Sequence, residues 1–483
     1  MRTIRYIALS DLHLGENNSL LTRVDSAGRT DPSSPSRTME KLTACIRTLV
    51  ESNPPDAEKP ALILNGDILE LALATMDQAL AVFGHFLRLL LEPGNLFSEI
   101  IHIPGNHDHH LWETARETQY RNYIARLPEG AKPETPWHTT KIVMDMHGED
   151  RLVSDLLTAA ARRLAGLGDR APEILVAYPN YGVLAATGDG TRSALFHHGH
   201  FLEDMYAAMS FATTYVNPEY RFPQDVYTLE QENFAWIDFF WSAMGRSGQV
   251  GGNIEQLYEV TRDGRRLRAV TDRLAKTIAG RHDIPLLWPD KTEEFVLKHL
   301  FRLLVKRVTR AQERQTTRRL KPQWPLSKKV NENLNRYLND YVARQWSGEG
   351  NPAADRVTFI FGHTHKPFQG MLGHTALLNT GGWVVESPKP EPLRGAAMVL
   401  LDDRLEAVNL RLYNEGDYGV RVEAAAGATS ELAGQVEALI QADPRPWRAF
   451  ANTVKQEARR RMNLLKTRGG AVTGHRHDSG GSA

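Results

Sequence analysis

The chain has 483 residues, of which 41% are hydrophobic and 24% are charged, so it can bury a large core and form more than one structural unit. Lys plus Arg and Asp plus Glu both total 58, and the resulting formal net charge of zero excludes a polyelectrolyte whose attraction for anions is spread over the whole molecule. The single cysteine, Cys45, excludes a disulfide within the chain, and its amphipathic surroundings indicate burial as a small hydrophobic residue.

The N-terminal end enters an alternating strand at Thr3–Leu9 and lacks the long apolar region of a signal peptide. Later apolar runs are too short to span a bilayer. We therefore expect a cytoplasmic protein without a transmembrane segment.

The first 200 residues alternate short apolar strands with helical patterns. The expected elements are strands at Ile4–Leu9, Ala61–Leu64, Glu99–Ile103 and Ser193–His197, with helices at Arg37–Val50 and Thr75–Leu91. This alternation is typical of a layered α/β core.

Helical periodicity replaces this pattern from about Phe201 to Gly350, and we interpret the stretch as an insertion in one α/β domain. Strand patterns then resume at Arg356–Phe361, Ala376–Leu378, Ala396–Leu401 and Leu405–Leu412, and an amphipathic helix is expected at Glu431–Leu465. The Gly- and Ser-rich tail from Gly469 is expected to be disordered. The predicted units are residues 1–200 and 351–417 as the two parts of the core, 201–350 as the insertion, and 418–483 as a C-terminal helix and tail.

Three short polar motifs follow predicted strands in the first half of the chain. In Ser10–His13, alternation along an extended segment lets Asp11 and His13 face one ion. In Asn65–Glu70, Gly66 permits a tight turn and Asp67 can bridge two cations. Pro104–Asp108 offers the amide oxygen of Asn106, the imidazole of His107 and a carboxylate, Asp108, that can orient it.

Two histidine motifs follow the strands on either side of the insertion. They are His197–His200 and Phe361–His365, and the second again places two histidines, His363 and His365, on one side of the chain. Any one motif can be a turn cap or a hydrogen-bonded core residue. Together, five motifs at strand ends supply the mixed nitrogen and oxygen ligands that divalent metals prefer, at the edge where α/β sheets bind ligands.

This ordered set resembles the signature of the calcineurin-like metallophosphoesterase superfamily, over the core on both sides of the insertion. The resemblance implies an αββα sandwich, in which two mixed β-sheets are flanked by helices, here with a large helical insertion. It implies one metal ion held by Asp11, His13, Asp67 and His365, and a second held by Asp67, Asn106, His198 and His363. His107 is then the imidazole that faces the leaving group, with Asp108 beside it as the second catalytic residue.

The resemblance implies a hydrolase acting on phosphoric ester bonds. Two divalent ions about 3.5 to 4 Å apart lower the pKa of a bridging water enough to supply metal-bound hydroxide near neutral pH. We expect the two ions to be manganese, with iron, zinc, nickel or magnesium as alternatives. The family more often has Asp where this chain has Glu70, which we place outside the metal ligands.

The substrate is not readable from the core motifs. We favour a phosphodiester or pyrophosphate over a monoester, because the insertion could cover an extended small-molecule or lipid-linked substrate. The alternatives are a nuclease, which neutral overall charge does not favour, and a catalytically inactive metal-binding scaffold, which would have lost ligands. The oligomeric state is not predicted.

Three further segments each allow two interpretations. The apolar helix around Phe234–Trp241 is expected to form the core of the insertion rather than an apolar substrate pocket. The basic amphipathic stretch Lys298–Lys321 is interpreted as a solvated helix face, with contact to anions or a peripheral membrane surface as the alternative. The loop from Glu16 to Arg37, which carries Asn17, Asn18 and Arg29, either contacts substrate or is a mobile surface loop.

Overall fold

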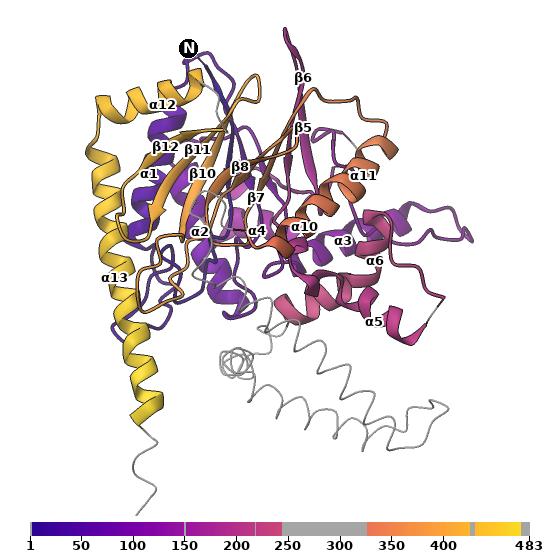
Figure 1. Ribbon diagram of the computed structural model, residues 1–483, viewed down its shortest axis with the longest axis horizontal. Helices are drawn as coiled ribbons and strands as arrows, with labels where there is room; N and C mark the ends of the chain where they lie inside the picture. Colours follow the sequence, from indigo (N-terminus) through magenta and orange to yellow (C-terminus); the bar gives the residue numbers. More distant parts are fainter. Residues whose placement is uncertain (1, 149–150, 218, 244–325, 426–429, 475–483) are drawn as a thin grey trace, which may run out of the picture.

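A computed structural model describes residues 2–148, 151–217, 219–243, 326–425 and 430–474. Two β-sheets form the centre of the molecule, with helices on their outer sides (Figure 1). The predicted basic stretch Lys298–Lys321 lies outside the described residues, so its interpretation stays a prediction. Among the described residues, none of the helices has the length and apolar character needed to cross a bilayer.

The larger sheet has seven strands. In spatial order they are β12 (Arg421–Ala424), β11 (Ala407–Asn414), β10 (Gly395–Asp402), β1 (Ile4–Leu9), β2 (Ala61–Leu64), β3 (Ile100–His102) and β4 (Ile174–Val176). Strands β1 to β4 are parallel, whereas β10 pairs antiparallel with β1 and continues antiparallel through β11 and β12. The carboxyl ends of β1, β2 and β3 therefore meet at one edge.

The smaller sheet has five strands. In spatial order they are β5 (Tyr181–Thr187), β6 (Gly190–Phe196), β7 (Arg356–Phe361), β9 (Thr375–Asn379) and β8 (Phe368–Leu372). Strands β6, β7 and β9 are parallel, and β5 and β8 are antiparallel edge strands. The predicted insertion thus leaves the sheet after β6 and returns at β7, its hydrogen-bonded neighbour.

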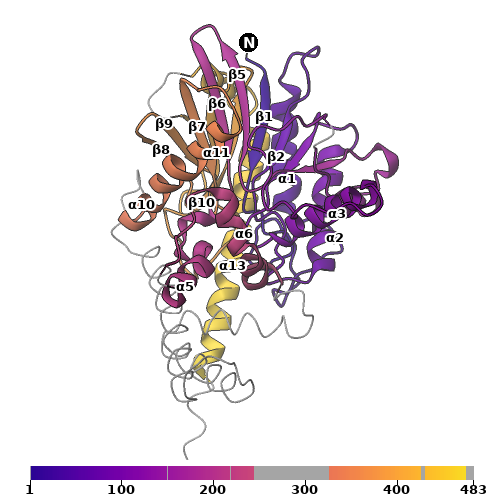
Figure 2. The ribbon, with the colours of Figure 1, turned by 90° about the vertical axis from the view of Figure 1, so that its right-hand side faces the viewer.

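Strand alternation divides the core into layers. In β1, Ile7 and Leu9 pack toward the helices, whereas Ala8 belongs to the apolar layer between the sheets. That inner layer joins Ala8 and Ile63 of the larger sheet to Phe196 and Ile360 of the smaller one. A strand buried on both faces presents apolar residues at successive positions, which explains the continuous apolar runs of the sequence. Figure 2 shows the two sheets side by side.

Helices cover the outer face of the larger sheet. They are α1 (Arg37–Glu51), α2 (Met76–Leu91), α4 (Asp155–Arg163), α12 (Glu431–Ala442) and α13 (Arg445–Gly474), with η1 (Gly168–Arg170) after α4. Ser36 caps α1 by accepting a hydrogen bond from the backbone N–H of Met39, and Cys45 is buried in this layer as predicted. Helix α13 packs along α1 (Figure 1).

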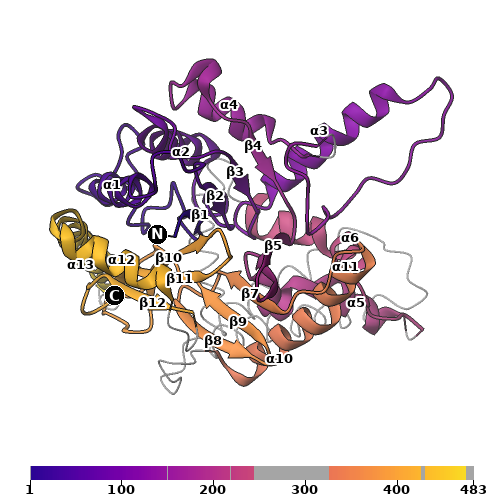
Figure 3. The ribbon, with the colours of Figure 1, turned by 90° about the horizontal axis from the view of Figure 1, so that it is seen from above.

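A second set of helices covers the smaller sheet and the strand ends. They are α3 (His110–Arg126), η2 (His200–Leu202), η3 (Asp204–Ala207), α5 (Ala208–Val216), α6 (Val226–Ile237), η4 (Asp238–Ala243), α10 (Lys328–Arg336), η6 (Tyr337–Val342) and α11 (Ala343–Gly348). All but α3 belong to the predicted insertion. Figure 3 shows α10 and α11 on the side of the molecule opposite α1 and α2.

The two-sheet architecture flanked by helices confirms the predicted fold class. Some local predictions were wrong. The expected helix Glu431–Leu465 is two helices, because Pro444 lacks the N–H that would continue α12 and instead precedes the first turn of α13. Helix α13 then continues to Gly474, past the predicted start of disorder at Gly469, and the rest of the tail lies outside the described residues.

The apolar stretch around Phe234–Trp241 is not buried on all sides. Ile237 and Trp241 pack in the core of the smaller sheet, whereas 57% of Phe239 is exposed. Strands β4, β5, β8 and β12 were not predicted. Strands β4, β8 and β12 have only three to five residues, too few for a clear period of two.

Candidate metal centre

The predicted ligands all follow the carboxyl ends of parallel strands. They are Asp11 and His13 after β1, Asp67 after β2, Asn106 after β3, His198 after β6, and His363 and His365 after β7. The two sheets meet at this edge: Asn65 Nδ2 donates hydrogen bonds of 3.2 Å to the His197 carbonyl oxygen and 3.3 Å to the Ile360 carbonyl oxygen. The structure therefore brings all seven side chains to one place.

Five of these residues have left-handed backbone conformations. Their φ angles are 51° at Asp11, 45° at His13, 51° at Asp67, 67° at His363 and 51° at His365. Residues with a Cβ atom seldom adopt positive φ, and such strained conformations cluster at functional sites. The shared conformation turns the chain sharply just beyond each strand and directs the side chains toward the junction of the sheets.

One group of ligand atoms comes from Asp11, His13 and His365. His365 Nε2 lies 3.2 Å from His13 Nε2 and 3.4 Å from Asp11 Oδ1. The three side chains offer atoms that all lie within 4.8 Å of one another. Two imidazole nitrogens and a carboxylate oxygen facing one point form a suitable pocket for a divalent cation.

A second group comes from Asp67, His198 and His363. His198 Nε2 lies 3.1 Å from Asp67 Oδ2, 3.3 Å from His363 Nδ1 and 3.1 Å from Asn106 Oδ1. Asp67 Oδ2 also lies 3.8 Å from His13 Nε2, a member of the first group. The carboxylate of Asp67 therefore lies between the two groups, as a bridging ligand must.

Three of the four histidines have the other ring nitrogen hydrogen-bonded to an acceptor. His13 Nδ1 donates to Glu70 at 2.7 Å, His365 Nδ1 to Glu386 at 2.5 Å and His198 Nδ1 to the Asn65 carbonyl oxygen at 3.3 Å. In His363 the two ring nitrogens exchange roles: Nδ1 faces the other ligands, and Nε2 lies 3.2 Å from a Glu203 carboxylate oxygen. In His13, His365 and His198 the hydrogen bond fixes the tautomer so that the remaining nitrogen presents a lone pair, which is the usual setting of metal-bound histidine. The donor set thus fits two divalent cations.

His107 lies beside these groups and is partly exposed. Its Nδ1 donates a hydrogen bond of 2.9 Å to Glu70, the carboxylate that also holds His13, and the rings of His13 and His107 meet edge to face with centroids 4.9 Å apart. Burial by itself would lower the pKa of His107, but the charges of Glu70 and Asp67 outweigh it and raise the pKa to about 10. His107 is accordingly cationic at neutral pH.

The prediction that Asp108 orients His107 was wrong. The buried Asp108 carboxylate accepts hydrogen bonds from the backbone N–H groups of Gly105 at 2.7 Å and Ile68 at 2.8 Å, and from His102 Nε2 at 3.1 Å. It therefore ties the turn after β3 to the turn after β2, and Glu70 orients His107 instead. Adjacency in sequence suggested the pair, but the sharp turn after β3 separates the two side chains.

Two glycines allow the close packing of this centre. A Cβ atom on Gly105 would lie 2.3 Å from Asp67 Oδ1, and one on Gly66 would lie 2.4 Å from His198 Nδ1. Both distances are far below van der Waals contact. Any larger residue at either position would displace a candidate ligand.

Two histidines of the fourth motif pack behind the centre. His197 accepts a hydrogen bond of 2.7 Å at Nδ1 from the backbone N–H of Gly199, and its ring meets Tyr337 edge to face. His200 stacks on Tyr178. Burial holds the pKa of both imidazoles well below the usual value, so both are neutral.

The sequence analysis missed three carboxylates beside the histidines: Glu70 and Glu386, which accept hydrogen bonds from them, and Glu203, which lies close to His363. Glu70 could have been found, because it belongs to the second motif. Burial would raise the pKa of Glu70, but the neighbouring His107 and His13 lower it to about 2, so the carboxylate is ionised. Glu203 and Glu386 lie outside the motifs, and only the fold brings them to His363 and His365.

One family model matches the first part of the chain. Residues 4–206 match the family model for calcineurin-like phosphoesterases, a range that contains four of the five motifs. No curated protein sequence matches the chain.

Among solved structures, the phosphopantetheinyl hydrolase of Mycobacterium tuberculosis is 14% identical, with coverage of 79% of this chain and 90% of that chain and a TM-score of 0.23. A candidate 5′-nucleotidase of Staphylococcus aureus is 10% identical, with coverage of 90% and 58% and a TM-score of 0.24. These TM-scores are too low to support a conclusion. The match over residues 4–206 supports assignment of that part of the chain to the calcineurin-like phosphoesterase superfamily.

Proposed function

We propose that the protein hydrolyses a phosphodiester or pyrophosphate with two divalent cations, manganese being the first candidate. Asp11, His13, Asp67 and His365 would hold one cation, and Asp67, Asn106, His198 and His363 would hold the other. The observation that carries the proposal is the anchoring of His13, His198 and His365 by hydrogen bonds through the ring nitrogen that faces away from the shared point, with Glu203 3.2 Å from the corresponding nitrogen of His363.

When bound, the cations would neutralise charge on the phosphoryl oxygens and lower the pKa of a water molecule near the phosphorus. The chain itself positions the reacting groups. Asp67 is fixed between the two groups by the backbone N–H of His107, which donates a hydrogen bond of 2.8 Å to Asp67 Oδ1. Because positive φ angles and close glycine contacts hold the ligands, little reorganisation is needed before reaction.

His107 would donate a proton to the oxygen of the departing alcohol. Its Nδ1 is held by Glu70, so Nε2 is the nitrogen available to the substrate. Proton donation of this kind contributes about 10²- to 10⁴-fold in rate and matters most for a poor leaving group. Glu70 links this step to the metal centre, since its other oxygen holds His13.

The preference for a diester or pyrophosphate over a monoester is supported by contacts from the insertion. Ser242 Oγ of η4 donates a hydrogen bond of 2.8 Å to the carbonyl oxygen of Asn106, and Glu203 lies 3.2 Å from His363 Nε2. The insertion therefore reaches the candidate ligands themselves and can shape a roof over an extended substrate.

The test is metal content measured together with hydrolysis. Protein loaded with Mn²⁺ should hold about two ions per chain by mass spectrometry of metals, and should hydrolyse bis-p-nitrophenyl phosphate faster than p-nitrophenyl phosphate. Asp67→Ala should lose activity and at least one ion. Full activity in that variant, or after exhaustive chelation, would exclude the two-metal mechanism; a faster monoester reaction would exclude the substrate preference.

A further inference from the structure

A cavity of about 210 Å³ opens between the loop after β1 and the start of α2. The loop contributes Gly15 to Asn18 together with Arg29 and Thr30, and the other wall is Leu73 and Gln78. The loop is held in place by hydrogen bonds from the Gly15 N–H to Thr22 Oγ1 at 2.9 Å and from Thr30 Oγ1 to the Gly15 carbonyl oxygen at 2.7 Å. The cavity is therefore a built feature of the fold.

The cavity lies on the His107 side of the metal centre. Its lining residue Glu16 has a carboxylate oxygen 3.9 Å from His13 Nδ1, the nitrogen that is bonded to Glu70. Glu70 in turn holds His107 at 2.9 Å. Glu16, His13, Glu70 and His107 therefore form one chain of contacts from the cavity to the proposed proton donor.

Three side-chain amides that have no hydrogen-bond partner among the described residues line the cavity. The side-chain amides of Asn17, Asn18 and Gln78 are half-buried, and they make no hydrogen bond with any other described residue. Each carboxamide combines a donor and an acceptor, the same combination that an alcohol hydroxyl offers. Half-buried amides left without partners favour a ligand that supplies such groups.

The charges of the lining disfavour an anionic occupant. Arg29 is the one cation among the described residues that line the cavity, and its guanidinium is already paired with Asp25 at 2.8 Å. Glu16 adds a carboxyl group at the end nearest His13. A second phosphate, as in a pyrophosphate substrate, would meet no free positive charge among the described residues of this lining.

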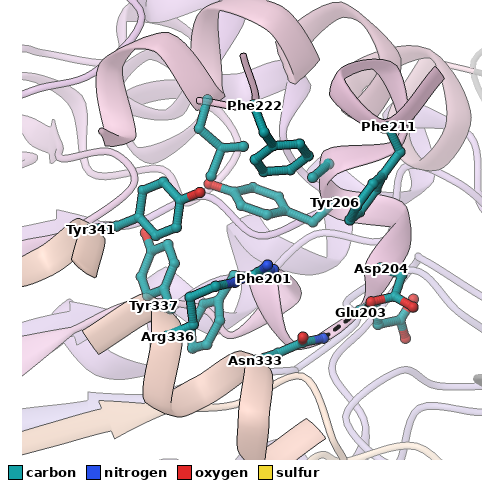
Figure 4. Close-up of a pocket in the computed structure, with 12 residues that line it drawn as sticks. Phe201, Glu203, Asp204, Tyr206, Phe211, Phe222, Asn333, Arg336, Tyr337 and Tyr341 are labelled. Atoms are coloured by element: carbon teal, nitrogen blue, oxygen red, sulfur yellow. Dashed lines mark hydrogen bonds between the residues drawn. The ribbon is translucent and has the colours of Figure 1, made fainter. Parts of the chain in front are cut away.

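A second cavity, beside Glu203, is too small for a substrate group. It lies between η3 and η6 beside Glu203, and its volume of about 20 Å³ holds roughly one water molecule. In Figure 4 the aromatic rings of Tyr206, Phe222, Tyr337 and Tyr341 lie close around it. The cavity beside Glu16 is about ten times larger, so of these two cavities it is the one with room for a leaving group.

We propose that the cavity lined by Asn17, Asn18 and Gln78 binds the leaving alcohol, and that this alcohol is a neutral, polyhydroxylated group such as a sugar or polyol. The inference rests on the proposed phosphoesterase function and narrows its substrate to a hydroxylated phosphodiester. The three carboxamides would bind its hydroxyl groups while His107 protonates the ester oxygen.

The test compares diesters of two primary alcohols on six-membered rings, one ring with hydroxyl groups and one without. In one, phosphate joins methanol to O6 of glucose; in the other, it joins methanol to cyclohexylmethanol. Loaded with Mn²⁺, the full-length protein should show at least a tenfold higher kcat/KM for the glucose diester, because a site built to bind hydroxyls rejects an analogue without them. Asn18→Leu and Gln78→Met should each reduce that ratio by about 3- to 10-fold, the loss of one hydrogen bond.

A matched control is Gln441→Met, which removes an exposed carboxamide from α12 and should leave the ratio unchanged. Equal kcat/KM for the two diesters in the wild type, or an unchanged ratio in both cavity variants, would overturn the inference while leaving the phosphoesterase function intact.

A binding measurement separates the two proposals if neither ester is hydrolysed. Calorimetry with the non-hydrolysable methylenephosphonates of glucose and cyclohexane should show tighter binding of the glucose analogue, and Gln78→Met should remove that difference. Equal affinities would refute the cavity assignment. Tighter binding of the glucose analogue without hydrolysis would sustain the cavity and refute the proposed function.

Discussion

Glu386 accepts a hydrogen bond of 2.5 Å from His365 Nδ1, although 21 residues separate the two in the chain. The guanidinium of Arg394 pairs with the same carboxylate, so Glu386 is itself held in place. The chain thereby fixes the tautomer of a candidate ligand from a position outside every recognised motif. The same arrangement at His13, with Glu70 as the acceptor, makes carboxylate anchoring a general feature of this centre.

Glu386→Gln should weaken Mn²⁺ binding by about 10- to 100-fold, the usual effect of removing a carboxylate behind a metal-bound histidine. Titration of metal-free protein with Mn²⁺ by calorimetry measures this directly. Glu391→Gln is the matched control, because Glu391 also pairs with Arg394, at 2.8 Å, but lies at the more exposed end of that pair and does not bond His365. Equal affinities in the wild type and Glu386→Gln would show that the anchor is unimportant.

His107→Ala should keep its metal and lose far more rate on an alkyl ester than on a p-nitrophenyl ester. The reason is that p-nitrophenolate departs without protonation, whereas an alkoxide gains about 10²- to 10⁴-fold from a proton donor. The measurement is kcat on both esters together with metal content. His374→Ala, in the turn between β8 and β9, controls for the loss of an imidazole elsewhere. Equal losses on both esters would point to a positioning role for His107.

Gly105→Ala should displace Asp67 and lower metal content, because the added methyl group would lie 2.3 Å from Asp67 Oδ1 and 2.7 Å from the Asp67 backbone nitrogen. We expect at least tenfold weaker Mn²⁺ binding and a loss of stability of about 1 to 3 kcal/mol, as overpacking typically causes. Gly94→Ala is the control, since a Cβ atom there meets open space. Wild-type Mn²⁺ affinity in Gly105→Ala would mean that Asp67 tolerates displacement.

We expect the stability of the protein to depend on pH because of the buried residue Glu230. Its buried carboxyl accepts hydrogen bonds from the hydroxyl groups of Tyr178, at 2.8 Å, and Tyr206. Burial raises the pKa of Glu230 to about 7 despite these hydrogen bonds and the charge of His109. The folded state therefore binds the proton more tightly than the unfolded state, whose pKa is near 4.5.

Between those two pKa values the folded state holds more protons, so stability is full below about pH 4.5 and falls as pH rises to about 7. The accumulated loss from this group is about 3 kcal/mol above pH 7. Glu230→Gln should remove this pH-dependent loss, because Gln does not titrate. Between pH 5 and pH 8 the unfolding free energy of the wild type should therefore fall relative to that of the variant. Parallel stability curves over that range would show that Glu230 is already ionised when folded.

The sequence by itself determined the α/β architecture and the positions of the candidate ligands. Strands such as Ile4–Leu9, Ala61–Leu64 and Arg356–Phe361 were predicted to the residue, because buried strands leave continuous apolar runs that end abruptly at polar turns. The ligand motifs are local as well, since each lies within six residues of a strand end. Their convergence follows from the parallel arrangement of the strands.

Only the tertiary structure decided which groups pair with which. Glu70 rather than the adjacent Asp108 orients His107, and Glu203 and Glu386 reach His363 and His365 from distant segments. The cavity beside Glu16 combines a loop with the first turn of α2, some sixty residues apart in the chain. Such contacts depend on the paths of turns and on left-handed backbone conformations at single residues, which apolar periodicity does not encode.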